Sequence, residues 1–171
     1  NWSEITGFQW DTANLTKNSD KHGIGCPEAE SVFLATDLRV LEDKLHSSSK
    51  EMRWHAFGTS SHARPLSITF TIRAHLIRII SARPMNARER NSYGYPKNKT
   101  PQVPREAANS TAHLDLTKAV SASFPQLKLS TETISLRMPA ALLDTIRIEA
   151  NRRDVPYQSL IKMTLAEQFR C

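Results

Sequence analysis

Apolar positions in the first half of the chain follow a helical period and then a strand period. Ala29, Val32 and Phe33 recur at the spacing of one helix face behind Pro27, a residue suited to the first turn of a helix. Short apolar runs of strand length follow at residues 38–41, 53–58, 66–72 and 76–82. The short connection between the last two runs predicts a hairpin.

Three further elements accompany these strands. Residues 8–10 alternate like a short strand, and residues 12–22 have the pattern of a polar helix that Gly23 ends. An arginine-rich helix is predicted over residues 86–93. This order of elements predicts an α+β fold, in which a small antiparallel sheet is flanked by helices.

The second half begins with a linker and then changes pattern. Residues 94–110 contain Pro96, Pro101 and Pro104 and no apolar period, which is typical of an extended linker. Residues 133–138 alternate strictly between apolar and polar positions, as in a strand.

Two amphipathic helices are predicted after this strand, opened by Pro139 and Pro156. Their apolar faces are Leu142, Leu143, Ile146 and Ala150 in the first, and Leu160, Ile161, Leu165 and Phe169 in the second. A strand and two helices are too little to bury a core alone, so we expect this part to dimerise.

Length and apolar content limit the class of protein. The 171 residues suit one domain or two small ones. No apolar run approaches the roughly 18 residues of a membrane-spanning helix, and the N-terminus lacks a signal-peptide pattern. We therefore expect a cytoplasmic protein with no membrane partner.

Metal and cofactor motifs are not apparent in the sequence. Cys26 and Cys171 are too far apart to suggest a metal site or a disulfide framework. The four histidines from His46 to His75 show no ligand spacing either. The sequence thus predicts no metal and no cofactor.

The charge favours a polyanionic partner. Basic residues outnumber acidic ones by 23 to 17, and the isoelectric point is near 9.6, which favours nucleic acid. Five arginines crowd residues 73–90, with Glu89 as the one acid among them. A solvated surface is the alternative interpretation of this cluster.

A set of motifs runs in order through residues 8–93. They are Phe8-x-Trp10-Asp11, Lys21-His22-Gly23-Ile24, Glu28-Ala29-x-x-Val32-Phe33, Glu42-Asp43, His46, Glu51-x-Arg53-Trp54, Arg78-Ile79-Ile80-Ser81-Ala82-Arg83 and Arg88-Glu89-Arg90-x-x-Tyr93. This set resembles the BrnT family, the ribonuclease toxins of bacterial type II toxin–antitoxin pairs. The resemblance implies a RelE-like fold and RNA as substrate.

A second set of motifs covers the C-terminal part. It consists of Phe124-Pro125-x-Leu127-Lys128, Thr133-Ile134-Ser135-Leu136-Arg137-Met138-Pro139 and Asp154-Val155-Pro156-Tyr157-Gln158-Ser159-Leu160-Ile161-Lys162. This set resembles ribbon-helix-helix antitoxins of the CopG/BrnA type. The two resemblances imply a toxin domain over residues 1–95, a linker over 96–113 and an antitoxin over 114–171. Within the antitoxin, residues 114–130 would wrap the toxin and residues 132–170 would bind DNA.

The toxin resemblance implies a metal-free ribonuclease. Such an enzyme needs groups that transfer protons, and it needs cationic side chains beside the phosphate. The guanidinium group of arginine can donate two parallel hydrogen bonds to phosphate oxygens. As candidates for this contact we rank Arg83 first, then Arg90, then Arg78. A regular strand would place Arg78 and Arg83 on opposite faces. His22, beside Lys21, is the acid–base candidate because histidine titrates near neutral pH.

Other candidates complete this site, and each candidate has a structural alternative. Glu51 and Arg53 lie two apart on a strand and can form an acid–cation pair, and Tyr93 can stack on a base. Alternatively, the arginines pair with Glu89 or Glu51, His22 ends its helix, and Tyr93 only packs.

The antitoxin resemblance implies two contact surfaces. Thr133, Ser135 and Arg137 form the outward face of the ribbon, which fits the major groove of DNA as a two-stranded dimer. The residues that would hold a phosphate at the second helix are Arg153, Tyr157 and Ser159. The anchors on the toxin would be Leu114, Leu116, Val120, Phe124 and Leu127, with Asp115 as partner of an arginine.

The sequence therefore predicts a toxin and its antitoxin in one chain. A metal-independent ribonuclease would be neutralised by the tethered antitoxin, which binds operator DNA and represses its own transcription. RNA, operator DNA and a second copy of the chain, in a dimer or tetramer, are the expected partners. The alternative is a DNA-binding regulator whose inactive toxin fold serves as co-repressor, since Asn14 and residues 25–36 depart from the family pattern.

Overall fold

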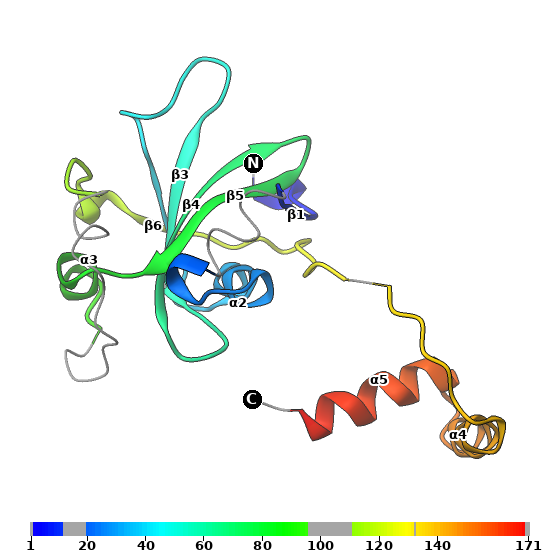
Figure 1. Cartoon of the computed structure of the whole chain (residues 1–171). Coiled ribbons are helices and arrows are strands. Elements are labelled where there is room, and N and C mark those ends of the chain that lie inside the picture. The colour runs from blue at the N-terminus through cyan, green and yellow to red at the C-terminus, as the bar shows by residue number, and fades with distance from the viewer. Residues whose placement is uncertain (1, 12–19, 96–110, 132, 170–171) are drawn as a thin grey trace. The chain divides into compact units, whose positions relative to one another are not determined.

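The computed structural model describes residues 2–11, 20–95, 111–131 and 133–169, which belong to two compact units, Asn1–Ser130 and Thr131–Cys171 (Figure 1). The strands of the first unit are β1 (Gly7–Gln9), β2 (Arg39–Glu42), β3 (Arg53–Thr59), β4 (Pro65–Arg73), β5 (Leu76–Pro84) and β6 (Val120–Ser121). Its helices are α2 (Cys26–Ser31) and α3 (Ala87–Ser92), and its 3-10 turns are η1 (Trp2–Glu4), η2 (Val32–Leu34) and η5 (Leu116–Lys118).

The six strands form one sheet in the order β1-β5-β4-β3-β2-β6. Neighbouring strands are antiparallel except β1, which pairs in parallel with β5 at the edge. The predicted α+β class is confirmed. The parallel edge strand departs from the wholly antiparallel sheet that we expected.

Local sequence signals account for several element ends. Pro27 lies in the first turn of α2, and Gly23, with φ of +60°, ends the helical residues 20–22. The remainder of the helix predicted over 12–22 lies outside the described residues. Asn86 and Glu89 form a reciprocal capping box at the start of α3.

The β4–β5 hairpin forms where the sequence predicts it. Ala74 and His75 both adopt positive φ, 44° and 67°. A two-residue turn needs positive φ at both positions if it is to match the twist of the two strands.

One face of the sheet carries the main apolar core. Alternate strand residues such as Ile68, Phe70 and Ile79 are fully buried there. They pack with Val32 and Phe33, which come from η2 directly after α2. This is the helix face that the spacing in the sequence predicts.

A bulge interrupts the pairing of β5 with β4. Thr69 pairs with Ser81 and Phe70 pairs with Ile79, so Ile80 has no partner across the ladder. An extra residue shifts the alternation of side chains by one position. A residue before Ile80 and a residue after it that would lie on opposite faces of a regular strand therefore lie on the same face here.

Residues 111–130, here called the arm, pass round the β2 edge of the sheet (Figure 1). Leu114 and Leu116 pack with Leu41 and Phe57 on the face opposite the main core. β6 then pairs with β2, with Val120 opposite Val40.

The end of the arm enters the main core. Phe124 and Leu127 belong to the same buried cluster as Phe33, and the ring centroids of Phe124 and Phe33 are 5.7 Å apart. The Ser130 backbone N–H donates to the Glu30 carboxylate over 2.8 Å. The arm is therefore an integral part of the first unit.

The second unit consists of α4 (Ala140–Arg152), α5 (Tyr157–Gln168) and the extended residues before them. Residues 133–139 make no strand pairing within the described chain, and Ile134 and Leu136 are 78% and 66% exposed. Among the described residues of this unit, the buried apolar ones are Ala150 of α4 and Leu160 of α5. Among the described helices, none combines the length and apolarity needed to cross a membrane.

Glu28 of α2 anchors the loop between β3 and β4. The carboxylate is 4% exposed and accepts hydrogen bonds from Arg64 Nε, at 2.6 Å, and from the Ser60 hydroxyl, at 2.9 Å. Burial alone would raise the pKa of Glu28, but hydrogen bonds from Arg64, Ser60 and His62 outweigh burial and lower it.

Glu28→Gln should lower the free energy of unfolding by about 1–3 kcal/mol at neutral pH, because an amide cannot pair with the Arg64 guanidinium. A lowered pKa in the folded state stabilises the fold fully above the ordinary value of 4.5, and this contribution is lost as pH falls through the lowered pKa. Denaturant unfolding at neutral and acid pH measures both effects. Glu4→Gln, at an exposed position, is the control, and equal acid sensitivity of the wild type and Glu28→Gln would contradict the assignment.

Candidate functional site

The face of the sheet opposite the main core carries polar and charged side chains. His55 of β3 pairs with Thr69 of β4, which pairs with Ser81 of β5, so the three side chains share this face. Because of the bulge at Ile80, Arg78 and Arg83 share it too, opposite Thr71 and Ser67. The regular alternation that we expected, with these two arginines on opposite faces, is wrong for this reason.

Arg83 lies at the end of β5 in a buried ion pair. Its two terminal nitrogens donate to the two oxygens of Glu89 over 2.8 and 2.7 Å, and Glu89 is fully buried. Glu89 also accepts from the backbone N–H of Asn86 and from the hydroxyl of Thr111 in the arm. Burial alone would raise the pKa of Glu89, but Arg83 and these donors outweigh it and lower that pKa. This geometry agrees with the alternative interpretation from the sequence, in which Arg83 pairs with Glu89 for structural reasons.

The other ranked arginines are also engaged. Arg78 forms an ion pair with Asp11, whose pKa is lowered by the hydrogen bond from Arg78. Arg90 donates to the carbonyl of Met85 over 2.5 Å. The three arginines ranked from the sequence therefore all have protein partners.

Arg88, which the sequence did not single out for the site, holds the arm. Its guanidinium donates to the backbone carbonyls of Thr111, Ala112 and Leu114 over 2.9, 3.2 and 2.7 Å. Carbonyl oxygens of the arm thus occupy the hydrogen-bond donors of Arg88 that a phosphate group would otherwise contact.

Glu51, Arg53 and Tyr93, the other candidates from the sequence, do not form the predicted arrangement. Glu51 pairs with Arg73 rather than with Arg53, and β3 begins only at Arg53. Tyr93 packs on Phe57, with ring centroids 5.1 Å apart, and its hydroxyl faces the Leu116 carbonyl of the arm. Burial raises the pKa of Tyr93 to about 12.

His22 lies close enough to Arg83 for the two charges to interact. Burial, followed by Lys21 and Arg83, lowers the pKa of His22, so this imidazole is neutral at physiological pH. Its Nδ1 atom is buried and has no hydrogen-bond partner among the described residues. A neutral imidazole can accept a proton, and the positive charges of Lys21 and Arg83 make this one a weaker base than a free histidine.

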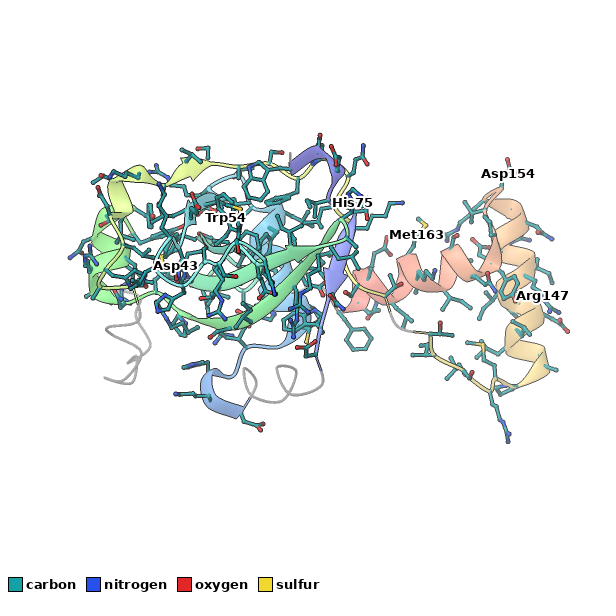
Figure 2. All side chains as sticks on the ribbon, turned by 90° about the horizontal axis from the view of Figure 1, so that it is seen from above. Asp43, Trp54, His75, Arg147, Asp154 and Met163 are labelled. Atoms are coloured by element: carbon teal, nitrogen blue, oxygen red, sulfur yellow. The ribbon has the colours of Figure 1, made fainter. Side chains whose placement is uncertain are left out.

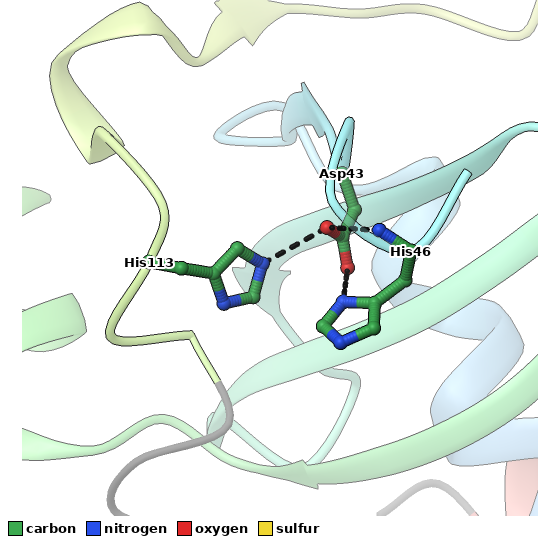
Figure 3. Close-up of side chains that lie close together, drawn as sticks. All are labelled: Asp43, His46 and His113. Carbon is green, nitrogen blue, oxygen red and sulfur yellow. Dashed lines mark hydrogen bonds and ion pairs between the residues drawn. The ribbon is translucent and has the colours of Figure 1, made fainter.

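A histidine cluster that the sequence did not predict surrounds Asp43, just after β2 (Figure 3). The Asp43 carboxylate is 2.8 Å from Nδ1 of His46, 3.1 Å from Nε2 of His55 and 2.9 Å from Nε2 of His113. Since a carboxylate only accepts hydrogen bonds, each of these nitrogens carries the proton. Burial alone would raise the pKa of Asp43, but the three imidazoles outweigh it and lower that pKa.

Two of these histidines come from the toxin half near the β2–β3 connection and β3, whereas His113 comes from the arm. Burial lowers the pKa of His55 and keeps it neutral, and its Nδ1 is 3.2 Å from the hydroxyl of Thr69. No spacing in the sequence links His46 with His113, so only the fold of the arm brings them together.

The predicted arm anchors are buried with one exception. Leu114, Leu116, Phe124 and Leu127 are 4–8% exposed, whereas Val120, which pairs with Val40 in the short strand β6, is 60% exposed. Asp115 contacts Thr117 and Lys118 and not the arginine that we expected.

The predicted DNA-contacting residues of the second unit lie at its surface. Thr133, Ser135 and Arg137 are exposed. In the helices, Arg153 donates to Glu149 over 2.8 Å, and the Arg147 guanidinium lies 5.5 Å from the ring centre of Tyr157. Ser159 lies in the first turn of α5, where its N–H donates to the Pro156 carbonyl.

Comparisons with known proteins identify both parts of the chain. Residues 10–89 match the family model described as ribonuclease toxin, BrnT, of type II toxin-antitoxin system. Residues 105–168 match the model described as CopG antitoxin of type II toxin-antitoxin system. The chain therefore joins the two components of a type II toxin–antitoxin system. Its N-terminal part is a BrnT toxin domain, and its C-terminal part is a CopG antitoxin domain.

A crystal structure of the Brucella abortus ribonuclease toxin, BrnT, is among the solved structures found. It is 19% identical to this chain, the match covers 48% of this chain and 99% of that one, and the TM-score is 0.38. No curated protein matches the chain.

Glu89→Gln should destabilise the first unit by about 3–5 kcal/mol, because the buried Arg83 guanidinium would lose its carboxylate. The matched control is Glu149→Gln, which breaks the exposed pair with Arg153 and should cost about 0.2–1 kcal/mol. Denaturant unfolding of the full chain measures both changes. Equal effects of the two substitutions would show that Arg83 is not fixed by Glu89.

Proposed function

We propose that the toxin domain is a metal-independent endoribonuclease held inactive by the tethered antitoxin. The observation that carries this proposal is the path of the arm over the polar face of the sheet. Arg88, Glu89, Asp43 and Tyr93 all contact residues 111–116 of the arm. The arm thus takes up donors and acceptors that an RNA substrate would need.

The reaction would form a bond from the ribose 2′-oxygen to the phosphorus and break the bond to the 5′-oxygen. A base takes the proton of the 2′-hydroxyl, an acid protonates the 5′-oxygen, and cations offset the charge on the phosphate. His22 is one acid–base candidate, with Lys21 beside it. His46 is a second, because it is half-exposed and the Asp43 carboxylate fixes its tautomer.

The remaining candidates keep the roles that the sequence suggested for them. Phosphate contact is proposed for Arg83, Arg90 and Arg78, acid–cation assistance for Glu51 and Arg53, and base stacking for Tyr93. Each of these side chains would have to exchange its present partner for RNA once the arm leaves. Glu89 and Asp11 therefore compete directly with phosphate for Arg83 and Arg78.

Tethering favours the inhibited state. The residues between Tyr95 and the arm keep the arm in the same chain as its binding surface, at an effective concentration on the order of millimolar. This concentration favours inhibition within one chain, whereas inhibition by the arm of a second copy would require that the two chains be held together as a dimer.

Leu114→Asp combined with Leu116→Asp should release the start of the arm and produce RNA cleavage in EDTA, where the wild type shows little. Both side chains are buried on the polar face, so burying two carboxylates there is unfavourable. Val120→Asp is the matched control, because it adds the same charge to an exposed arm position. Limited proteolysis reports release of the arm. A released arm without cleavage would contradict the proposal.

A second candidate function is a DNA-binding regulator whose toxin domain is inactive and acts as co-repressor. The ion pairs of Arg83 with Glu89 and of Arg78 with Asp11 favour it, since both arginines already have carboxylate partners. This candidate predicts operator binding without RNA cleavage in the released variant.

DNA binding and repression of its own transcription in the cytoplasm are proposed for the second unit. Ile134 and Leu136 are exposed in the single chain, and a groove lined by Met138, Ile146 and Leu160 is apolar. Pairing of two ribbons in a homodimer, or in a tetramer of two dimers, would cover these residues. Thr133, Ser135 and Arg137 would then face the major groove.

Arg137→Ala should abolish specific operator binding and leave the oligomeric state unchanged, because Arg137 would contact a base edge. Lys128→Ala, outside the ribbon, removes the same charge and is the control. Footprinting with light scattering measures both properties. An unchanged footprint for Arg137→Ala would remove this residue from the readout.

A further inference from the structure

Asp43, His46 and His113 are the one group of three potential metal ligands that the described part of the chain brings together. Their ligand atoms all lie within 4.8 Å of one another. We propose that they bind a divalent transition-metal ion of the zinc class, which fastens the arm to the toxin domain. Two ligands come from the toxin and one from the antitoxin, so the ion would join the two halves of the chain.

The geometry supports a shared ion. Nδ1 of His46 and Nε2 of His113 point at different oxygens of the same carboxylate, at 2.8 and 2.9 Å, and the two rings meet edge to face (Figure 3). Zinc lies about 2.0–2.2 Å from histidine nitrogen and carboxylate oxygen, so small shifts admit an ion among the three atoms. Each imidazole would then carry its proton on its other ring nitrogen.

A supporting group fixes the carboxylate. His55 is 4% exposed, and its Nε2–H donates to Asp43 over 3.1 Å while its Nδ1 faces Thr69. The backbone N–H of His46 donates to the other oxygen over 3.3 Å. Carboxylate ligands of metals are typically oriented by such hydrogen bonds, which also strengthen their affinity for the ion.

The composition of the group selects the class of ion. Two imidazoles and one carboxylate suit zinc and its neighbours, whereas calcium and magnesium require more oxygen ligands. His46 is half-exposed, which leaves a solvent-facing side for a water as fourth ligand. The ion pairs of His62 with Glu28 and of His75 with Glu4 each involve one histidine and offer no comparable set.

The proposed ion adds a coordinate link at the start of the arm, where Arg88 contributes only hydrogen bonds. Its loss would weaken the hold of residues 111–116 on the toxin domain. That regulatory consequence rests on the proposed function, but metal binding itself does not. The cleavage assay above is carried out in EDTA, so the ion does not contribute to it.

The test is metal binding by the full chain after treatment with EDTA and desalting. Calorimetry with Zn²⁺ should give one site per chain, and Co²⁺ should give the visible absorption of a four-coordinate site. His113→Ala and His46→Ala should each weaken binding at least about tenfold. His75→Ala is the matched control, because His75 lies at the β4–β5 turn, at the opposite end of the first unit from Asp43 (Figure 2).

His113→Gln separates metal ligation from hydrogen bonding. Its amide can still donate to Asp43 and keep the arm in place, but it is a poor ligand for zinc. Loss of metal binding in this folded variant, with protection of the arm by Zn²⁺ against proteolysis only in the wild type, is the expected result. Absence of a Co²⁺ spectrum, or equal affinity in His113→Gln and the wild type, would overturn the proposal. Neither outcome affects the cleavage test with Leu114 and Leu116.

Discussion

The apolar core of the first unit is built from both halves of the chain. Phe124 and Leu127 of the arm are buried in one cluster with Trp2 and Phe33 of the toxin domain. Each large apolar side chain buried in this way contributes about 1.5–3 kcal/mol. Removal of the whole arm would therefore expose core residues that it covers and lower the stability of the first unit.

The arm meets the two faces of the sheet by different physical means. Its end is held by burial of Phe124 and Leu127, whereas its beginning is held in part by charged hydrogen bonds from Arg88 and by the contacts to Asp43 and Glu89. Hydrogen bonds to charged groups contribute about 1.5–3 kcal/mol each, which is similar to the contribution of one large buried apolar side chain. Leu114 and Leu116 add apolar burial at the beginning of the arm, so both of its ends are held by contacts of comparable strength.

A single extra residue in β5 organises the polar face. The bulge at Ile80 lets Ile77 and Ile79 face the core while Arg78 and Arg83 share the other side. Bulges are frequent next to functional sites because they redirect a side chain without breaking the sheet.

Sequence alone determined the α+β class and most elements of the first unit, since helix and strand periods, Pro27, Asn86 and the hairpin turn act locally. The strand expected over residues 133–138 has no strand pairing within the described chain, and the two units divide at Ser130 rather than at the expected linker. The sequence also identified four of the five arm anchors as buried, because apolar residues in a polar segment need a surface to cover them. Tertiary structure decided what depends on register and on distant contacts. The bulge changed the face of the sheet on which Arg78 lies, and Val120 of the short strand β6 is exposed. The histidine cluster arises only because the arm returns to the toxin domain and places a distant side chain beside Asp43, an arrangement for which no local pattern exists.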